Sequence, residues 1–269
     1  MHLVIIGNGA AGLSALSRFR TIDRDSTVTL ISAEQASAYS RVLLPYYLRR
    51  KIPHENLFIR RPEDYEKLDA HTEFGIGVSR VEPESRKLTL ENGRSISFDR
   101  LLIASGSRPF LPPIDGLAGS NVLHLWTLHD TERLDALFQQ GRRALILGSG
   151  FIALQAAWAA RQRGLQVTVY ELLPRIMPTV LDEAGAAVLQ RKVEEHGVEV
   201  RAGIQTERVD RSKPGVLTVQ AQGHPPLEVD LIIVGAGVRP NIEFLADSPV
   251  RTDRGILIEE HMQTNVPGI

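Results

Sequence analysis

Two glycine-rich runs constrain the fold of this 269-residue chain more than any other feature of its sequence. Residues 7–12 read Gly-Asn-Gly-Ala-Ala-Gly, and residues 148–153 read Gly-Ser-Gly-Phe-Ile-Ala. Each run follows a short apolar segment that is typical of a buried parallel strand, and each precedes a segment with helical spacing. A strand, a tight turn, a helix and a second strand form one βαβ unit of about thirty residues. The sequence therefore predicts two βαβ units.

The segments around the two runs repeat one plan. Apolar, β-branched segments predict strands at 2–6, 27–31, 100–104, 143–147, 166–170, 198–200 and 231–234. Helical spacing predicts helices at 10–19, 130–140, 151–163 and 185–196, with Thr131 or Asp130 as the cap of the second. Turn residues predict an antiparallel meander at 77–82, 87–91 and 95–97, and a hairpin at 216–220 and 227–229. The repeat predicts an α/β chain with two domains of one architecture, whereas residues 37–70 carry only weak periodicity.

The glycine spacing in both runs is typical of loops that bind dinucleotides. The first glycine permits a tight turn, the second lets the backbone approach a pyrophosphate, and the third lets helix and strand pack closely. Ala153 is an accepted variant at the third position. Free N–H groups at the start of each helix would face the phosphates. The predicted ligand-binding residues are Gly7, Gly9, Ala10, Ala11 and Gly12 in the first run, and Gly148, Gly150, Phe151 and Ile152 in the second.

An acidic residue about twenty positions after each run is expected to hydrogen-bond the ribose hydroxyls of the nucleotide. Glu34 lies after the second predicted strand and fits this role, although Ser32 is nearer to the usual position. In the second half, Glu171 directly follows its strand. A carboxylate there accepts a hydrogen bond from a free 2′-hydroxyl and repels a 2′-phosphate, so it predicts NAD rather than NADP. Arg175, a few residues further on, is the opposing signal.

Composition excludes several classes of function. A net charge of -1, from 31 basic and 32 acidic residues, gives no basis for a nucleic-acid or membrane-surface partner. The sequence has no apolar run near the roughly 18 residues that a membrane span needs, and its start does not resemble a signal peptide, so a soluble cytoplasmic protein is expected. Cysteine is absent, which excludes cysteine-based redox steps and cysteine-bound metals within the chain. The eight scattered histidines predict no metal site.

Three further segments resemble the flavoproteins with two dinucleotide-binding domains, the pyridine nucleotide-disulfide oxidoreductase family. Residues 101–109, Leu-Leu-Ile-Ala-Ser-Gly-Ser-Arg-Pro, are similar to the segment by which the chain leaves the FAD domain of that family. Residues 230–241 are similar to its return crossing, and residues 263–269 to the run that leads into its second FAD motif. Together with the two glycine runs, the resemblance covers nearly the whole chain.

The resemblance implies two Rossmann-like, three-layer domains, with the NAD domain inserted into the FAD domain. A discontinuous FAD-binding domain is expected at 1–112 and 236–269, and an NAD(H)-binding domain at 113–235. NADH would reduce FAD by hydride transfer, for which the protein supplies placement and electrostatics. Members of the family continue into a Gly-Asp flavin motif and an interface domain that forms a homodimer. The chain is therefore expected to be truncated, with an incomplete FAD domain, and the full-length protein to be a homodimer.

The segment 39–47, Tyr-Ser-Arg-Val-Leu-Leu-Pro-Tyr-Tyr, points to a subclass. It is similar to the flavin-proximal segment of nitrite reductase flavin domains, rubredoxin reductases and NADH oxidases. Thiol-using members have a cysteine before a similar Leu-Pro-Tyr-Tyr, and Val42 occupies that place here. The resemblance therefore implies that electrons pass to an external acceptor, which could be an iron–sulfur or haem partner, a rubredoxin or ferredoxin, a quinone-like molecule or oxygen.

The resemblance also assigns individual residues. Arg41, Ser105, Gly106 and Arg108 are expected to contact FAD, and Gly235 to contact NAD. Many members have a glutamate on the second fingerprint helix that faces the flavin. Gln155 fills that place and is the one candidate for a catalytic role, although a glutamine cannot take up a proton.

Several of these side chains have plainer interpretations. Arg41 could be an exposed loop arginine, and Arg239 is better explained as a structural residue of the crossing. The three tyrosines of the segment could flank the flavin or pack in the core: Tyr39, Tyr46 and Tyr47. Two basic clusters could dock an acidic redox partner or be solvated surface charge: Arg49-Arg50-Lys51 and Arg60-Arg61.

Two hypotheses for the function follow. The first is an FAD-dependent NADH oxidoreductase that reduces an external protein or small molecule. The second is a nucleotide-binding regulatory or partner module with little redox turnover, motivated by the missing cysteine, by Gln155 and by the missing C-terminal segment.

Overall fold

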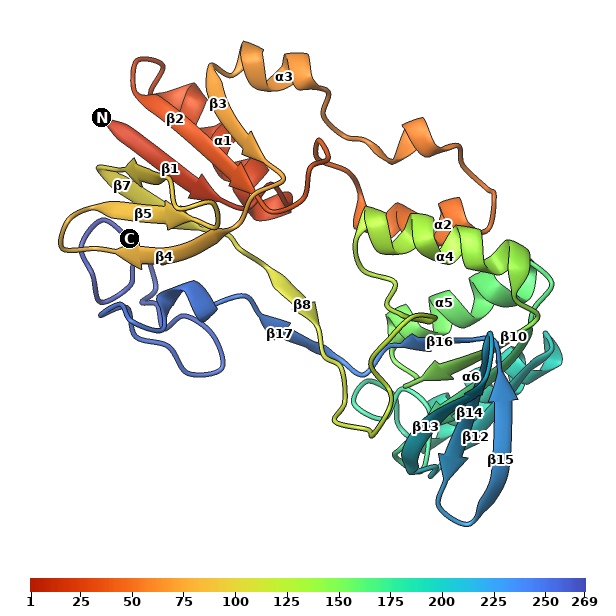
Figure 1. The fold of residues 1–269 in the computed structure, drawn as a ribbon. Helices are drawn as coiled ribbons and strands as arrows, with labels where there is room; N and C mark the ends of the chain where they lie inside the picture. Colours follow the sequence, from red (N-terminus) through yellow and green to blue (C-terminus); the bar gives the residue numbers. More distant parts are fainter. The chain divides into compact units, whose positions relative to one another are not determined.

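The structure is a computed structural model that describes residues 1–269, except for the side chain of Ser212. The chain divides into two compact units, whose elements are labelled in Figure 1. The first unit contains Met1–Ser40, Phe58–Arg108 and Arg239–Ile269. The second unit contains Arg41–Leu57 and Pro109–Val238. Both units are therefore discontinuous in sequence, and the two segments of the second unit lie between the three segments of the first.

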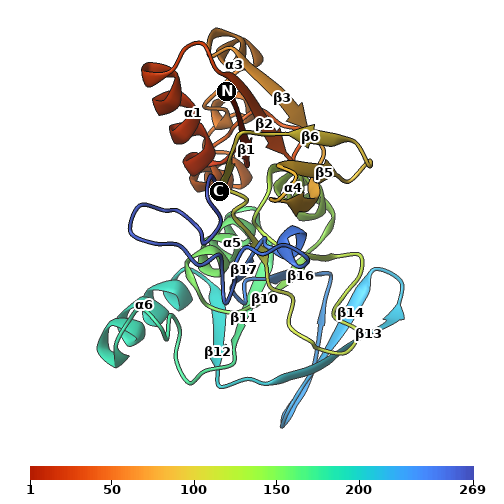
Figure 2. The same cartoon turned by 90° about the vertical axis from the view of Figure 1, so that its left-hand side faces the viewer.

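The first unit is built on a four-stranded parallel sheet with the order β3-β2-β1-β7. The strands are β1 (His2–Ile6), β2 (Thr27–Ser32), β3 (Ala70–Phe74) and β7 (Arg100–Ile103). In β1, Val4 and Ile6 face the antiparallel sheet made by β4 (Val78–Glu82), β5 (Lys87–Leu90) and β6 (Ser95–Ser97). Ile5 points to the opposite face, where it packs with residues of α1 (Ala10–Ile22) and α3 (Pro62–Lys67). Figure 2 shows α1 and α3 beside this sheet. The alternation of side chains along β1 thus produces three layers.

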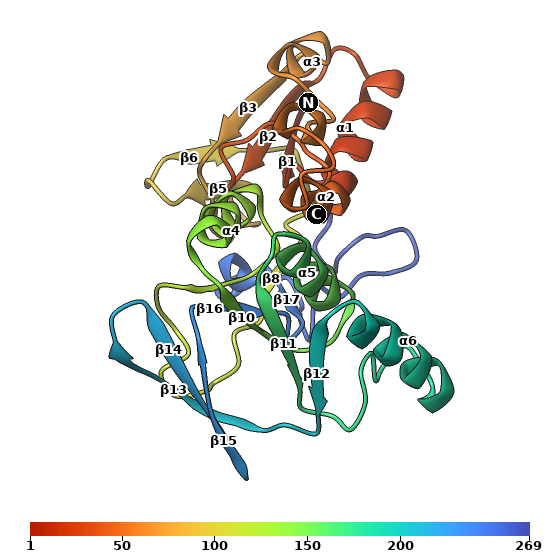
Figure 3. The ribbon, with the colours of Figure 1, turned by 90° about the vertical axis from the view of Figure 1, so that its right-hand side faces the viewer.

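The second unit repeats these layers on a five-stranded parallel sheet with the order β12-β11-β10-β16-β9. Its strands are β9 (Val122–Leu123), β10 (Arg143–Leu147), β11 (Gln166–Glu171), β12 (Val198–Ala202) and β16 (Leu231–Val234). One face packs against the antiparallel sheet of β13 (Thr206–Lys213), β14 (Val216–Ala221) and β15 (His224–Val229). On the parallel sheet, α5 (Phe151–Gln162) contacts β10, β11 and β16, while α6 (Glu183–Glu195) lies beside the edge strand β12 (Figure 3).

Residues 41–57 were predicted to belong to the FAD domain, but they pack within the second compact unit. The short helix α2 (Leu44–Leu48) contacts α4 (Leu128–Gln140) and α5. The guanidinium of Arg163 on α5 donates to the Leu48 carbonyl at 3.0 Å and to the Asp135 carboxylate at 2.5 Å. Arg50 donates to the other oxygen of Asp135 at 2.8 Å. Burial of Leu44 and Leu48, together with this charged network, explains the placement.

The predicted helices and strands of both βαβ units are confirmed, with ends that differ by a few residues. The predicted cap of α4 is wrong. Thr127 is the N-cap, because its hydroxyl accepts from the Asp130 N–H at 3.0 Å. Asp130 instead completes a capping box by accepting from the Thr127 N–H at 3.1 Å. The weakly periodic region 37–70 contains four short helical elements that were not predicted, namely η1 (Arg41–Leu43), α2, η2 (His54–Leu57) and α3.

Two short strands occur where the chain passes from one unit to the other. They are β8 (Ser107–Pro109) and β17 (Val238–Pro240), and they pair in a two-stranded sheet. Both lie in the segments that were predicted to be crossings. Among the helices that the structure describes, none is both long enough and apolar enough to cross a membrane.

Candidate nucleotide sites

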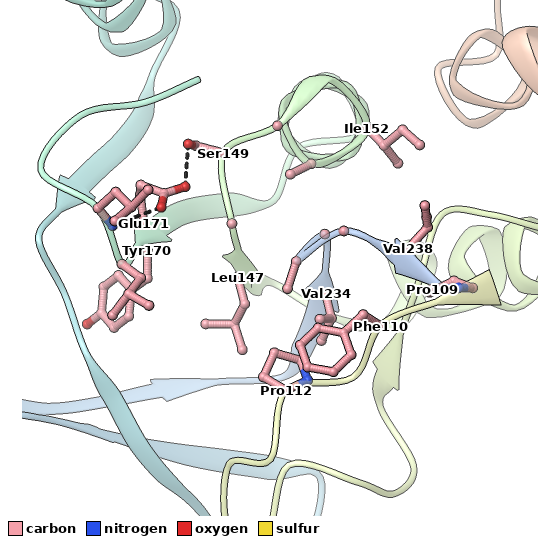
Figure 4. Close-up of a pocket in the computed structure, with 18 of the residues that line it drawn as sticks. Pro109, Phe110, Pro112, Leu147, Ser149, Ile152, Tyr170, Glu171, Val234 and Val238 are labelled. Carbon is pink, nitrogen blue, oxygen red and sulfur yellow. Dashed lines mark hydrogen bonds between the residues drawn. The ribbon is translucent and has the colours of Figure 1, made fainter. Parts of the chain in front are cut away.

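The second unit contains a pocket of about 1030 Å³ at the carboxyl ends of its central strands (Figure 4). Leu147, Glu171 and Val234, the last residues of β10, β11 and β16, all line it. The second glycine run forms one wall, and apolar residues such as Phe110 and Pro112 form another. Ligands of open α/β sheets bind outside the carboxyl ends of the strands, so this is the expected place for a nucleotide.

The glycines of the second run differ in what they do for the protein. Gly148 has φ +101°, and a Cβ there would lie 2.5 Å from the Gly235 carbonyl oxygen, so the turn itself requires glycine. Gly150 has φ −68°, and a Cβ there would meet nothing within 4 Å among the described residues. The fold therefore does not require glycine at 150. A methyl group there would enter open space at the N-terminus of α5.

The third position of this run shows how helix and strand meet. A Cβ on Gly235 would lie 2.6 Å from the Ala153 Cβ, so the alanine on α5 is accommodated by a glycine just after β16. The predicted role of Gly235 in binding NAD is therefore accompanied by a packing role. Its place in the pocket lining allows both.

Glu171 is held by donors from two directions. It is buried, with 8% of its surface exposed. One carboxylate oxygen accepts from the Ser149 hydroxyl at 2.5 Å, and the other accepts from the Leu173 N–H at 2.9 Å (Figure 4). Ser149 is fully buried and its oxygen also accepts from the Met177 N–H at 3.1 Å. Ser149 was not predicted as a site residue, because the position between the first two glycines has no assigned role in the motif.

Arg175, the residue whose position in the sequence argued against NAD, is hydrogen-bonded within its own loop. Its guanidinium donates to the Leu181 carbonyl at 3.3 Å and to the Pro178 carbonyl at 3.2 Å. These bonds hold the loop that follows Glu171. They supply a structural role for Arg175 that does not involve a 2′-phosphate.

The predicted residues at the start of α5 separate into two groups. Phe151 and Ile152 line the pocket, and 66% and 42% of their surfaces are exposed. Gln155 lies one turn further on the exposed side of α5, outside the residues that line this pocket. The structure thus places Phe151 and Ile152 with Glu171 around one cavity, and it leaves Gln155 apart from that cavity.

The first glycine run has the same construction. Gly7 has φ +114°, and a Cβ there would lie 2.0 Å from the Ala104 carbonyl oxygen. A Cβ on Gly12 would lie 1.9 Å from the Gly7 carbonyl oxygen. Gly9 has φ −87°, and a Cβ there would meet nothing within 4 Å among the described residues. Gly9 is thus the counterpart of Gly150. The exposed Ala10 and Ala11 form the first turn of α1 beside it.

A buried tyrosine supports the first run. Tyr65, on α3, is 3% exposed and donates its hydroxyl hydrogen to the Asn8 side-chain oxygen at 3.0 Å. The same hydroxyl accepts from the Ala38 N–H at 2.9 Å. Tyr65 therefore links the glycine loop to the segment that follows β2. It lies in the weakly periodic region, 57 residues from Asn8 in sequence, and no local pattern could have predicted the pairing.

Glu34 lies two residues beyond the end of β2 and is half-buried. Its carboxylate accepts from the Tyr39 hydroxyl at 2.5 Å. The Ser32 hydroxyl accepts from the Glu34 N–H at 3.2 Å, which shapes the turn. The predicted ribose ligand and one of the predicted flavin-flanking tyrosines are thus brought together, although Tyr39 was expected beside the flavin or in the core.

The residues assigned to FAD near the first crossing bind the return crossing. The Ser105 hydroxyl donates to the Asn241 carbonyl at 2.7 Å, and the Asn241 N–H donates to the Gly106 carbonyl at 3.0 Å. Arg108 makes a bidentate pair with Glu243. Hydrogen bonds from Arg108 hold the pKa of the Glu243 carboxyl below its usual value. These residues therefore have a structural role in joining segments 136 residues apart in sequence.

Arg41, also assigned to FAD, belongs to the second compact unit. Its guanidinium lies over the Trp126 ring at 5.2 Å from the ring centre. This cation–π contact gives Arg41 a partner within its own unit.

Comparison with known families identifies this arrangement. The family model for pyridine nucleotide-disulphide oxidoreductases matches residues 1–269, the whole chain. The chain belongs to this family. The resemblance seen in the glycine runs and crossings is thereby confirmed, as is the fold class of parallel α/β, Rossmann-like units.

Individual relatives share the full length of the chain. It is 31% identical to an NADH oxidase of Methanocaldococcus jannaschii, covering 100% of this chain and 62% of that protein. It is 33% identical to the ferredoxin–NAD(+) reductase component of the p-cumate 2,3-dioxygenase system of Pseudomonas putida, covering 99% of this chain and 65% of that protein. The structure of the water-forming NADH oxidase of Lactobacillus brevis bound to NADH matches with a TM-score of 0.92 at 26% identity, covering 100% of this chain and 61% of that one. The chain thus spans somewhat less than two thirds of the length of these relatives.

Proposed function

We propose that this protein is an FAD-dependent NADH oxidoreductase that passes electrons to an external acceptor. FAD would bind on the first glycine run and NADH on the second. The observation that carries the proposal is the pair Gly9 and Gly150, where the fold has room for a side chain and yet the residue is glycine. Close approach of a pyrophosphate to each helix N-terminus accounts for a glycine at both positions.

The chain supplies residues for each nucleotide. In the second unit, the N-terminus of α5 would bind the pyrophosphate and Glu171 the ribose hydroxyls of the adenosine. In the first unit, the N-terminus of α1 and Glu34 would have these roles toward FAD. FAD, when bound, supplies a two-electron carrier that can release electrons singly or in pairs. The protein residues bind and orient the two nucleotides.

The acceptor is proposed to lie outside the chain because the sequence contains no cysteine. A dithiol relay within these residues is therefore impossible. Among the relatives, one is named an NADH oxidase and another a ferredoxin–NAD(+) reductase component. Both names fit delivery of electrons to an external molecule, either a small oxidant or an iron–sulfur protein. We also propose, from the family resemblance, that the protein is cytoplasmic and forms a homodimer.

The test is anaerobic reduction of the full-length protein loaded with FAD. The visible absorbance of its flavin should bleach on addition of one equivalent of NADH and return on addition of an oxidising dye. NADPH at the same concentration should act more slowly, because Glu171 disfavours a 2′-phosphate. A protein that binds NADH but neither bleaches nor reduces any of several dyes would instead be the regulatory module considered above.

A further inference from the structure

We propose that Ser149 is a positioning residue that sets the preference of the second unit for NADH over NADPH. It would act through Glu171, by fixing the direction in which the carboxylate faces the pocket. The inference rests on the proposed function, since it assumes that the pocket of the second unit binds a dinucleotide. It concerns a residue for which the glycine motif itself gives no role.

The geometry shows that Ser149 joins three parts of the site. It follows Gly148 in the turn, and its hydroxyl hydrogen is donated to the Glu171 carboxylate at 2.5 Å. Its oxygen accepts from the Met177 N–H, which belongs to the loop after β11. Ser149 and Glu171 both line the pocket, yet the serine is fully buried. Figure 4 shows the two side chains pointing toward each other beside the start of α5.

Burial makes this contact important for the carboxylate. A buried carboxylate is costly unless donors satisfy it, and hydrogen bonds to a charged group are stronger than neutral ones. A carboxylate has about four acceptor positions. The Ser149 hydroxyl and the Leu173 N–H each use a position on a different oxygen of Glu171. The positions that remain can accept from the two vicinal hydroxyls of a ribose.

Fixing the carboxylate also determines how the pocket responds to a 2′-phosphate. With a donor on each oxygen, Glu171 cannot rotate away from an approaching anion without losing a hydrogen bond. Without the Ser149 hydroxyl, the carboxylate would be held by the Leu173 N–H on one oxygen, and it could turn aside. Discrimination against the 2′-phosphate should therefore depend on a hydroxyl that touches neither phosphate nor ribose.

The experiment uses two probes that require no flavin, ADP-ribose and its 2′-phosphate. Their dissociation constants are measured by calorimetry for the wild-type chain and for Ser149→Ala. The wild type should bind ADP-ribose more tightly than its 2′-phosphate. The measured ratio is the dissociation constant of the 2′-phosphate divided by that of ADP-ribose. Ser149→Ala should lower this ratio by about tenfold, because the variant loses a hydrogen bond to a charged group.

Two further variants separate positioning from stability. Thr131→Val removes another fully buried hydroxyl, which donates to the carbonyl of Thr127, the N-cap of α4, and lies outside the residues that line the pocket. It should lower the melting temperature without changing the ratio. In a Glu171→Gln background, Ser149→Ala should change the ratio by less than about twofold, because Ser149 acts through the carboxylate.

The outcomes are distinct. If Ser149→Ala leaves the ratio unchanged, the proposed role of Ser149 is overturned. It is also overturned if Ser149→Ala changes the ratio equally with and without the Glu171 carboxylate. Both results leave the nucleotide site itself intact. If the wild type binds neither probe, the proposed function of the second unit fails, and this inference fails with it.

Discussion

The two glycine loops have the same backbone register but hold their acidic residues differently. The Gly7 N–H donates to the Ile31 carbonyl at 2.8 Å, and the Gly148 N–H donates to the Tyr170 carbonyl at 2.8 Å. The next residue along the second strand is therefore equivalent in the two units. That residue is Ser32 in the first and Glu171 in the second. The second unit thus has its carboxylate at the strand end, while the first has it two residues later, at Glu34.

This displacement changes how each loop is supported. In the second unit, Ser149 binds the carboxylate directly, and both side chains are buried. In the first unit, the equivalent position is Asn8, which is tied through Tyr65 to the backbone of the segment after β2. The direct contact of Ser149 with the carboxylate can link the glycine loop to the preference for a free 2′-hydroxyl over a 2′-phosphate. The indirect contact through Tyr65 can only hold the loop in place.

The two units also differ in the residues at two positions. One position is on the helix that follows the glycine run (α1 or α5), and the other is just after the strand that precedes the crossing (β7 or β16). The first unit has Gly12 on the helix and Ala104 after the strand, and the second has Ala153 on the helix and Gly235 after the strand. The position on the helix thus carries a methyl group only in the second unit, and the position after the strand carries one only in the first.

Gly12→Ala should have the largest effect. Its Cβ would lie 1.9 Å from a backbone carbonyl oxygen, which cannot move without shifting the turn. We expect a loss of about 3 kcal/mol or more in the free energy of unfolding, together with loss of FAD binding. The matched change Ala153→Gly should cost only about 1 kcal/mol, as for a glycine placed in a helix. Urea unfolding curves for both variants check this, and equal losses would show that the two contacts are equivalent.

Gly235→Ala should come next and should be partly reversible. The new methyl would lie 2.6 Å from the Ala153 Cβ, so helix and strand must separate, at a cost of about 1–3 kcal/mol. Adding Ala153→Gly removes the opposing methyl group on α5 and should restore part of the lost free energy of unfolding. The double variant then reproduces the arrangement of the first unit. If the two losses simply add in thermal unfolding, the methyl groups do not interact.

Tyr65→Phe should weaken the first unit by about 1–3 kcal/mol, because it leaves the buried Ala38 N–H without its acceptor. FAD affinity should fall as well, since Asn8 loses its donor. The control is Tyr170→Phe in the second unit, whose hydroxyl accepts a long bond of 3.3 Å from Arg201. Unfolding and FAD titration of both variants should show the larger loss for Tyr65→Phe, and the reverse order would remove the proposed relay.

The smallest effect concerns two carboxylates, one in each unit. Burial raises the pKa of Asp230, but hydrogen bonds from Arg143 and from the N–H groups of Arg142 and Arg143 outweigh it, and the pKa lies below its usual value. The pKa of the exposed Glu243 is lowered mainly by its hydrogen bonds with Arg108. A lowered pKa adds stability above the unfolded value, which is lost as the pH falls through the folded value.

Asp230→Asn should therefore flatten the decline in stability below about pH 4, where the unfolded carboxyl takes up its proton. Glu243→Gln should do so less, because its ion pair is exposed and worth under about 1 kcal/mol. Unfolding free energies measured from neutral to acid pH would compare the two. A larger change for Glu243→Gln would mean that the crossing pair matters more than its exposure indicates.

The sequence predicted the strands that are mostly apolar and that are followed directly by a glycine. Strands β1, β10 and β16 are observed at the predicted residues, because each contains at least four consecutive apolar residues that are mostly buried. Strand β13 was not predicted, since Thr206–Lys213 is mostly polar and its register shifts twice. The glycine loops and Glu171 were found by spacing. Ser149 and Tyr65 were not, because their partners are 22 and 57 residues away and are identified only by the fold.

The most direct test of the account is the matched pair Gly9→Ala and Gly150→Ala. Neither new methyl group would meet an atom within 4 Å among the described residues, so both variants should fold like the wild type. FAD content and ADP-ribose binding are then measured on each. We predict that Gly9→Ala loses FAD and keeps ADP-ribose, while Gly150→Ala loses ADP-ribose and keeps FAD. If both variants keep both ligands, or if the losses are exchanged, the assignment of FAD to the first loop and NADH to the second is contradicted.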